Sequence, residues 1–437
     1  MSGTAPAPDR GPVLRGRDLL GALWAGFLVW VPLALGGQLL AWTAFAISGS
    51  FRPWSWVKIG LLNTLGVARV PFEMRAEPPP GLPVGAATFG VGSMVVTVAL
   101  GAGTIAAVVL LFRAGRGAAG VRRPWPALVA GAAVAVGFAL PMGLSSLLVT
   151  LRFPSLGIDA LRPIVWQAFA LPLALALIAG GIGAMSSVVP VTAAGPGGRR
   201  MAAAARGAWH TMTWGLVLAL LGTLILAALR PGASTSYGRW LEGQGPGGAV
   251  LAMYHALLLP NQSIDVLATS MGSCTAFVFS EGVTSICLGG LDVGDELTAL
   301  FTADAVVVDR DGTRRAPFGP GYLAFLLVPA FAAVAGGRRA AAGARGSRER
   351  ILRATWAGAG FGLLAGVAAW AATISISGDA EPIASLGADP VETAALAVVW
   401  GVVGGAVGSR LPDPAGVPEE PAIRRQGLDE PSETSLK

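Results

Sequence analysis

Residues 336–353 read GGRRAAAGARGSRERILR, residues 354–376 read ATWAGAGFGLLAGVAAWAATISI, and residues 377–392 read SGDAEPIASLGADPVE. The stretch thus begins with six arginines, continues as an apolar run, and ends with four acidic residues and no basic one. About 20 apolar residues are enough for a helix to cross the hydrocarbon core of a membrane. Because arginine gathers on the cytoplasmic side of such helices, the stretch predicts a transmembrane helix whose N-terminal end faces the cytoplasm.

The composition extends this prediction to the whole chain. Of its 437 residues, 53% are hydrophobic and 13% are charged, with a mean hydropathy of +0.64. Soluble domains usually contain about 25% charged residues, so we predict an all-α integral membrane protein. The pI of 10.1 does not indicate nucleic-acid binding, because the basic residues lie at the ends of apolar runs, where they orient transmembrane helices.

Apolar runs long enough to span a membrane occur eight times, at 19–47, 86–112, 126–151, 163–188, 208–229, 320–337, 354–376 and 391–409. The first run is too long for the core of a signal peptide, and we expect it to remain as an uncleaved span. With a cytoplasmic N-terminus, 20 of the 31 basic residues but only 9 of the 25 acidic residues lie inside. This distribution predicts a multi-pass protein of the plasma membrane with both termini cytoplasmic.

The domain organisation follows from these eight runs. We expect a cytoplasmic tail (1–18), five spans (19–229), an extracytoplasmic or re-entrant region (230–319), three further spans (320–409) and a disordered cytoplasmic tail (410–437). The outer connections alternate long, short, long, short, which is typical of a tandem duplication of four spans. Coincidence remains the alternative, because no similarity between residues of the two halves is evident.

The first long outer connection contains an interrupted apolar segment at 54–70. Lys58 and Arg69 are eleven residues apart, so on a continuous helix they would share one face. Trp54 is suited to the depth of the lipid headgroups. We therefore predict an interfacial or re-entrant helix rather than a full span.

The second long outer connection contains GGAVLAMYHALLLP at 247–260, a segment too short for a full span, which also favours a re-entrant or interfacial helix. Pro260 and Asn261 are expected to end this helix, with side chains of the next residues satisfying the freed backbone groups. Non-helical backbone at membrane depth must face protein or a water-filled cavity. The candidate pocket at this break consists of His255, Pro260, Asn261, Gln262 and Ser263.

The only two cysteines, Cys274 and Cys287, flank a predicted β-hairpin that turns near Ser280, Glu281 and Gly282. A turn centred on Ser280 and Glu281 would place the cysteines opposite each other, whereas a turn one residue later would not. Both cysteines fall on the oxidising side, so we predict a disulfide, with two buried thiols as the alternative. A second hairpin is expected to turn at Asp311–Gly312. Together the hairpins predict a small extracytoplasmic β cap.

Catalytic and metal-binding chemistry is not indicated by the sequence. The central parts of the eight runs contain no Asp, Glu, Lys or Arg, although ion-coupled transporters usually place such residues there. For Gln38, Gln167 and His210, interhelical hydrogen bonding is the favoured role. HExxH, GxSxG and Walker A motifs are absent, and His210 and His255 fall on opposite predicted sides, which argues against a histidine zinc site. We therefore predict no enzyme activity and no cofactor.

Small residues recur on the last two predicted spans. GxxxG spacing relates Gly358, Gly362 and Gly366 in the seventh span, and Gly401 and Gly405 in the eighth. Such faces let helix backbones approach closely. We expect these two spans to pack on each other, with homodimerisation as the alternative. The arginine-rich segment 338–353 is interpreted as an anchor for the topology, with binding of anionic lipid as the alternative.

A resemblance to known proteins is carried by WVKIGLLNTLGVARVPFEM at 56–74 and LLFRAGRGA at 110–118. These segments resemble uncharacterised actinobacterial polytopic membrane proteins, including streptophobe-type proteins. LLLPNQ at 257–262 is similar to a related group linked to cell division. The abundance of Arg, Gly and Ala is also typical of GC-rich bacterial genomes. The resemblance implies a multi-pass envelope protein without assigned chemistry.

The sequence therefore favours a non-enzymatic scaffold or regulatory protein of the envelope, whose partners are the lipid bilayer and other membrane or envelope proteins. The alternative is a transporter or channel for a neutral or lipid-like solute, with its site at the broken helix at Pro260–Ser263. Nucleic acid is not expected as a partner.

Overall fold

The computed structural model describes residues 15–49, 53–76, 92–98, 101–119, 124–153, 158–188, 196–229, 242–243, 245–279, 282–287, 290–293, 307–308, 314–317, 324–344, 346–377 and 382–412. The predicted turns at Ser280–Glu281 and at Asp311–Gly312 lie outside these residues, as does most of both predicted cytoplasmic tails.

Within the described residues, six helices are long and apolar enough to cross a membrane. The chain is accordingly a helical membrane protein. These helices are α1 (Gly16–Ser48), α4 (Pro124–Ser146), α5 (Val165–Val188), α9 (Leu327–Ala341, preceded by a 3-10 turn), α10 (Ser347–Ala372) and α11 (Pro390–Gly408). The start of α11 illustrates the local signals: the Asp389 carboxylate accepts hydrogen bonds from the backbone N–H groups of Val391 and Glu392 at 2.9 and 2.7 Å.

The remaining long helices are α2 (Pro53–Gly66), α3 (Gly101–Ala118), α6 (Pro196–Leu229) and α8 (Pro246–Met271). Helix α6 covers the predicted fifth span. The prediction of one span at 86–112 is wrong, because its described part is divided between strand β2 (Gly92–Thr97) and helix α3. The β-branched residues Val95, Val96 and Thr97 favour a strand, and this strand is paired along both edges, with β1 and β10.

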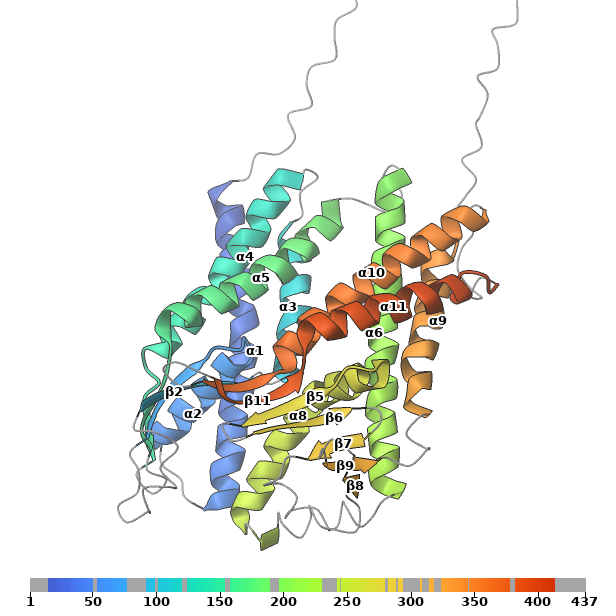
Figure 1. The fold of residues 1–437 in the computed structure, drawn as a ribbon. Helices are drawn as coiled ribbons and strands as arrows, with labels where there is room; N and C mark the ends of the chain where they lie inside the picture. Colours follow the sequence, from blue (N-terminus) through green and yellow to red (C-terminus); the bar gives the residue numbers. More distant parts are fainter. Residues whose placement is uncertain are drawn as a thin grey trace, which may run out of the picture.

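Among the described residues, eleven strands join one antiparallel sheet, in the order β3-β4-β1-β2-β10-β11-β5-β6-β7-β9-β8 (Figure 1). The strands are β1 (Phe72–Ala76), β2, β3 (Leu151–Phe153), β4 (Ile158–Pro163), β5 (Thr275–Phe279), β6 (Gly282–Cys287), β7 (Gly290–Val293), β8 (Val307–Val308), β9 (Arg314–Pro317), β10 (Ile374–Ser377) and β11 (Pro382–Ala388). The sequence predicted only the hairpins β5–β6 and β8–β9. The sheet also takes strands from runs that were expected to be spans or short connections.

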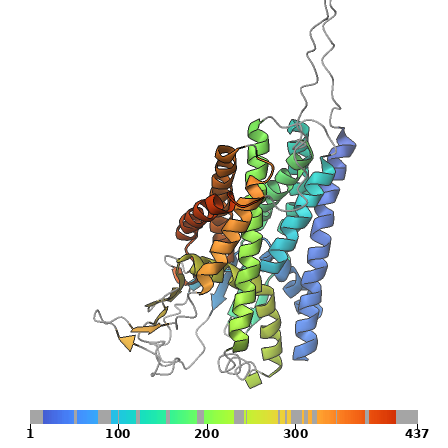
Figure 2. The same ribbon diagram turned by 90° about the vertical axis from the view of Figure 1, so that its right-hand side faces the viewer.

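The strands lie in the lower half of Figure 1, below α4, α5, α10 and α11 and beside the lower parts of α1, α6 and α8, and in Figure 2 the yellow and orange strands extend to the left of the helices. They come from four connections, namely those between α1 and α3, α4 and α5, α6 and α9, and α10 and α11. The other three connections between these helices, as far as they are described, contribute no strand. The β-structure therefore lies on one side of the molecule, at the ends of α4, α5, α10 and α11.

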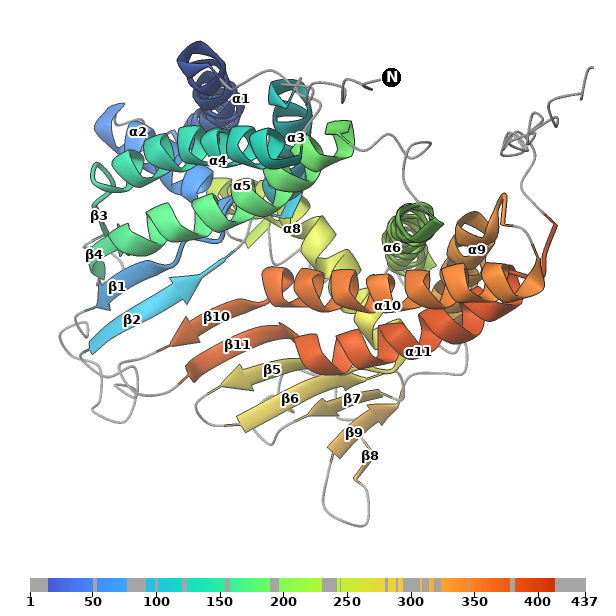
Figure 3. The same ribbon diagram turned by 90° about the horizontal axis from the view of Figure 1, so that it is seen from above.

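The chain divides into two halves with the same order of elements (Figure 3). In the first half, α1, α2, α3, α4 and α5 accompany strands in the order β3-β4-β1-β2. In the second half, α6, α8, α9, α10 and α11 accompany strands in the order β10-β11-β5-β6, which β7, β9 and β8 extend. Pairing of β2 with β10 joins the halves into one sheet.

Each half has its own apolar core. In the first half the fully buried side chains include Leu111, Phe138 and Met142. In the second half Phe361 packs with Leu267 and Met271 of α8. The core of each half thus lies between helices that belong to that half.

Glycine determines how closely α10 and α11 pack. A Cβ atom added to Gly358 would lie 2.6 Å from the carbonyl carbon of Gly401, and one added to Gly366 would lie 2.8 Å from the Cβ of Ala394. An added Cβ on Gly362 would collide with Val398, and one on Gly405 would lie 3.1 Å from the carbonyl oxygen of Ala354. The structure therefore places the predicted glycine face between two helices of the same chain.

Candidate functional site

Helix α8 runs from Pro246 to Met271 without interruption. The prediction that Pro260 and Asn261 end the helix is therefore wrong. An internal proline removes one backbone hydrogen bond and usually costs about 3 kcal/mol, but neighbouring groups can offset this loss inside a packed protein. Beside Pro260 the Ser263 hydroxyl donates to the Leu259 carbonyl at 2.8 Å, and the buried Asn261 Nδ2 donates to the Ala372 carbonyl of α10 at 3.2 Å. These bonds hold this part of α8 in place, although neither reaches the Ala256 carbonyl that loses its helical donor at the proline.

The five residues of the candidate pocket lie on one continuous helix and make contacts in different directions. His255 Nε2 and Gln262 Nε2 lie 2.5 Å apart, two turns along α8. Pro260 and Asn261 instead face Gly101 of α3, where an added Cβ would collide with the Asn261 Oδ1 atom. Ser263 is buried and bonded within its own helix. These residues therefore serve separate contacts of α8.

Lys58 and Arg69 do not share a helical face, because α2 ends at Gly66. Arg69 N–H donates to the Gly66 carbonyl at 3.1 Å, and Val70 N–H donates to the Leu65 carbonyl at 3.3 Å. This pair of bonds is a Schellman motif, which places Arg69 in the left-handed region with φ of 56°. The motif redirects the chain into β1 and points the Arg69 side chain away from the helix.

The contact between the two halves is the candidate functional site, and we call it the seam. We define it by β2, Asn63, Arg69 and Gly101 of the first half with Tyr254, Asn261, Trp370, Thr373 and β10 of the second. The Tyr254 hydroxyl donates to Asn63 Oδ1 at 3.1 Å. The seam is therefore polar at several points, although the helices around it are apolar.

Arg69 makes the most extensive polar contact across the seam. Its Nη2 donates to the Thr373 carbonyl at 3.1 Å, and its guanidinium carbon lies 4.2 Å from the centroid of the Trp370 ring. Its Nε and Nη1 atoms are buried without a hydrogen-bond partner in the described structure. Burial lowers the pKa of the Arg69 guanidinium from its ordinary value. The favourable cation–π contact is thus made by a partly desolvated cation.

Sequence reasoning missed most of the seam. Arg69 was assigned only to a helical face shared with Lys58, and Asn63 lies in the same interrupted apolar segment 54–70 without a predicted role. Only the three-dimensional structure shows that both residues contact the second half. Tyr254, Trp370 and Thr373 gave no signal beyond being polar or aromatic residues near the ends of apolar runs.

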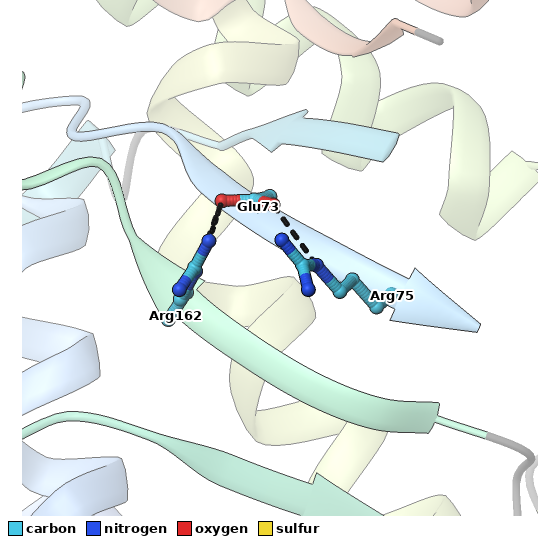
Figure 4. A network of polar contacts seen from close by, with 3 residues as sticks. All are labelled: Glu73, Arg75 and Arg162. Atoms are coloured by element: carbon cyan, nitrogen blue, oxygen red, sulfur yellow. Dashed lines mark hydrogen bonds and ion pairs between the residues drawn. The ribbon is translucent and has the colours of Figure 1, made fainter. Parts of the chain in front are cut away.

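On the first half of the sheet, charged side chains form a second polar cluster (Figure 4). Glu73 of β1 faces Arg162 of β4, whose Nε and Nη2 donate to Glu73 Oε2 at 2.9 and 2.8 Å. Arg75 Nε donates to Glu73 Oε1 at 3.2 Å. The hydrogen bond from Arg162 is the largest cause of the lowered pKa of Glu73; burial, the next largest effect, opposes it, and the hydrogen bond from Arg75 adds to the lowering. This part of the sheet is therefore charged on its exposed face.

Asp265 connects α8 to the sheet. Its Oδ1 accepts a hydrogen bond from the backbone N–H of Ala388 in β11 at 3.2 Å. Burial raises the pKa of Asp265 to about 6, and the bond from Ala388 opposes the shift. A carboxyl group with this pKa changes its charge near neutral pH.

The register of the β5–β6 hairpin favours a disulfide. Thr275 pairs with Ile286 and Phe279 pairs with Gly282. Extended by one position, this register sets Cys274 opposite Cys287.

At the end of the bundle away from the sheet, arginines of the segment 338–353 contact the chain itself. Arg338 Nε donates to the Pro412 carbonyl at 2.7 Å, and Arg350 donates to the carbonyls of Ser409 and Leu411 at 2.8 and 2.6 Å. Cations at the C-terminal end of a helix also interact favourably with its dipole. These arginines therefore bind the backbone carbonyls that follow the C-terminal end of α11.

Gln38 and His210 make local contacts. Gln38 Nε2 donates to the Val57 carbonyl of α2 at 3.1 Å, which is an interhelical hydrogen bond of the expected kind. His210 Nε2 accepts from Trp214 Nε1 at 3.0 Å within α6.

No protein-family model matches the chain, and no match to it was found among curated proteins or among solved structures.

Proposed function

We propose that this chain is a non-enzymatic scaffold or regulatory protein of the cell envelope, which presents one extracytoplasmic sheet to partner proteins. The observation that carries the proposal is that four connections at one end of the bundle all contribute strands to a single sheet. Each connection alone would be a flexible loop. Joined by backbone hydrogen bonds, they form a broad and rigid surface suited to binding another protein.

The proposed topology has eight spans, namely the six apolar helices together with α3 and α6. Helix α6, with 34 residues, exceeds the about 20 needed to cross the membrane, and α3, with 18, is near the lower limit. Arg116, Arg200 and Arg339 lie at helix ends away from the sheet. Their position supports a cytoplasmic location for that end, with both termini inside and the sheet outside.

Helices α2 and α8 are proposed to lie on the outer side at the membrane interface. Helix α2 has 14 residues, too few to span. Both helices lead directly into strands of the sheet. On this side the Cys274–Cys287 disulfide is also proposed, supported by the register of β5 and β6 and by the stability of disulfides in oxidising compartments.

A transporter for a neutral or lipid-like solute is the second candidate. The observation that favours it is the similar order of elements in the two halves, because many transporters consist of repeats with a site between them. Because α8 is continuous, the site would have to lie at the seam rather than at a broken helix.

Photo-crosslinking in intact cells distinguishes these functions. A photoreactive residue is introduced at Arg75 or Asp159, both exposed on the sheet, or at Arg116, which is exposed at the opposite end of the bundle. A scaffold should give one defined protein adduct from the sheet positions and not the same adduct from Arg116. The proposal fails if neither sheet position gives an adduct while the purified protein is stabilised against heat by a small solute.

A further inference from the structure

The two halves correspond residue by residue in the sheet. Phe72 pairs with Pro163 in the first half, and Thr275 pairs with Ala388 in the second. Phe72 therefore corresponds to Thr275, and Pro163 corresponds to Ala388. On the neighbouring strands, Leu151 pairs with Leu161 as Ile374 pairs with Leu386. Leu161 precedes Pro163 by the same number of positions as Leu386 precedes Ala388, so one register describes both halves next to the helices, up to the irregularities that follow Arg75, Leu151 and Ile376.

Helix packing gives the same correspondence. An added Cβ on Gly115 of α3 would collide with Gly180 of α5, and one on Gly337 of α9 would collide with Gly405 of α11. Gly180 follows Pro163 by the same number of positions as Gly405 follows Ala388. Two independent kinds of contact, strand pairing and helix packing, thus give one alignment.

In this alignment the counterpart of Arg69 is a glycine, Gly272, because Arg69 precedes Phe72 by the same number of positions as Gly272 precedes Thr275. In the second half, Gly272 N–H donates to the Thr269 carbonyl and Ser273 N–H donates to the Ala268 carbonyl, which repeats the two bonds that end α2. Gly272 has φ of 106°. Glycine is the usual residue at this position of a Schellman motif. The first half carries arginine there, at a backbone conformation that disfavours any residue with a Cβ.

A second difference complements the first. In the first half, Lys58 Nζ donates to the Thr150 carbonyl at 2.9 Å, just beyond the end of α4. The counterparts of Lys58 and Thr150 are Asn261 and Thr373. Asn261 is neutral and donates instead to the Ala372 carbonyl. The Thr373 carbonyl therefore accepts its hydrogen bond from a cation of the other half, Arg69.

We propose that the chain is a tandem duplication of one unit of five helices and four strands, and that Arg69 clamps the two copies together at the seam. The clamp lies beside the sheet junction, where Ser375 of β10 pairs with Thr97 of β2. Arg69 joins a turn of the first copy to the end of α10 in the second through a hydrogen bond and the face of Trp370. The inference is independent of whether the protein is a scaffold or a transporter.

The substitution Arg69→Gly tests the clamp by the sign of its effect. Glycine fits the left-handed backbone better than arginine, so a side chain without a role at the seam would leave Arg69→Gly more stable than the native chain. If Arg69 clamps the two copies together, Arg69→Gly should instead be less stable than the native chain. The full-length protein in detergent should unfold a few degrees lower, and hydrogen exchange should quicken at least about tenfold in β2 and β10 but not in β3.

Trp370→Leu provides a second variant that leaves the turn unchanged. If the two copies are held together by the contact between the Arg69 guanidinium and the Trp370 ring, the double variant should lose less in unfolding temperature than the sum of the losses from Arg69→Gly and Trp370→Leu. Ser347→Ala, at the far end of α10, serves as the control and should leave exchange in β2 and β10 unaltered. An Arg69→Gly protein that unfolds at a higher temperature, or whose β2 and β10 exchange at the native rate, would overturn the proposal.

Discussion

Gly358 and Gly401 lie so close that a Cβ on either residue would come within 2.6 Å of the other helix's backbone. Small residues on both helices therefore determine the spacing of α10 and α11. The same face is occupied within the chain, which leaves it unavailable for the homodimer that the sequence also allowed.

Gly358→Val should destabilise the protein by about 1–3 kcal/mol, because the added atoms overpack the helix contact. The measurement is thermal unfolding of the purified protein in detergent. Gly181→Ala is the matched control, since Gly181 lies in α5 with nothing within 4 Å of an added Cβ, and it should be neutral or slightly stabilising. Equal effects of the two changes would contradict the packing described here.

Pro260→Ala should leave α8 intact and raise stability modestly, because alanine restores the backbone N–H that proline lacks and is the better helix former. Thermal unfolding measures the gain, and hydrogen exchange should show protection at residue 260 itself. A protein that misfolds or gains no protection there would indicate that the proline ends a helix after all, as the sequence suggested.

Asp265 should make stability depend on pH. Its folded pKa of about 6 exceeds the ordinary value of 3.8, so between these values the folded state binds more protons than the unfolded state. The free energy of unfolding should therefore fall as pH rises from about 4 to 6, and stay lower above pH 6.

Asp265→Asn removes this dependence while keeping an oxygen that can accept the Ala388 N–H. At pH 7 the variant should be more stable than the native chain, by on the order of 2 kcal/mol. At pH 4 the two should be nearly equal. Parallel stability curves of variant and native protein across pH 4–7 would show that Asp265 is not the responsible group.

The sequence predicted the parts of the fold that depend on composition and short patterns. Apolar length identified the runs that became α1, α4, α5, α10 and α11, and glycine spacing identified the contact between the last two. Alternating β-branched residues around a turn identified the β5–β6 hairpin, whose register follows the centre at Ser280 and Glu281. Each of these signals is local.

The sequence failed where tertiary contacts override local preference. The apolar run at 86–112 was divided because β2 has partners on both edges, and β10, one of those partners, is far from it in sequence. Pro260 remains in a continuous helix, and the neighbouring Asn261 side chain binds this part of α8 to the Ala372 carbonyl of α10. Arg69 crosses to residues about 300 positions away. In the sequence alone, nothing distinguishes the residues that make these contacts from ordinary interruptions of an apolar run.

Thiol labelling of Cys274 and Cys287 in intact cells tests the central claim, which is that the sheet lies outside the membrane. A membrane-impermeant maleimide is applied with and without prior reduction by an impermeant reductant. We predict no labelling before reduction and labelling of both cysteines after it. Labelling that appears only after the membrane is permeabilised would place the sheet in the cytoplasm and contradict the proposed topology and function together.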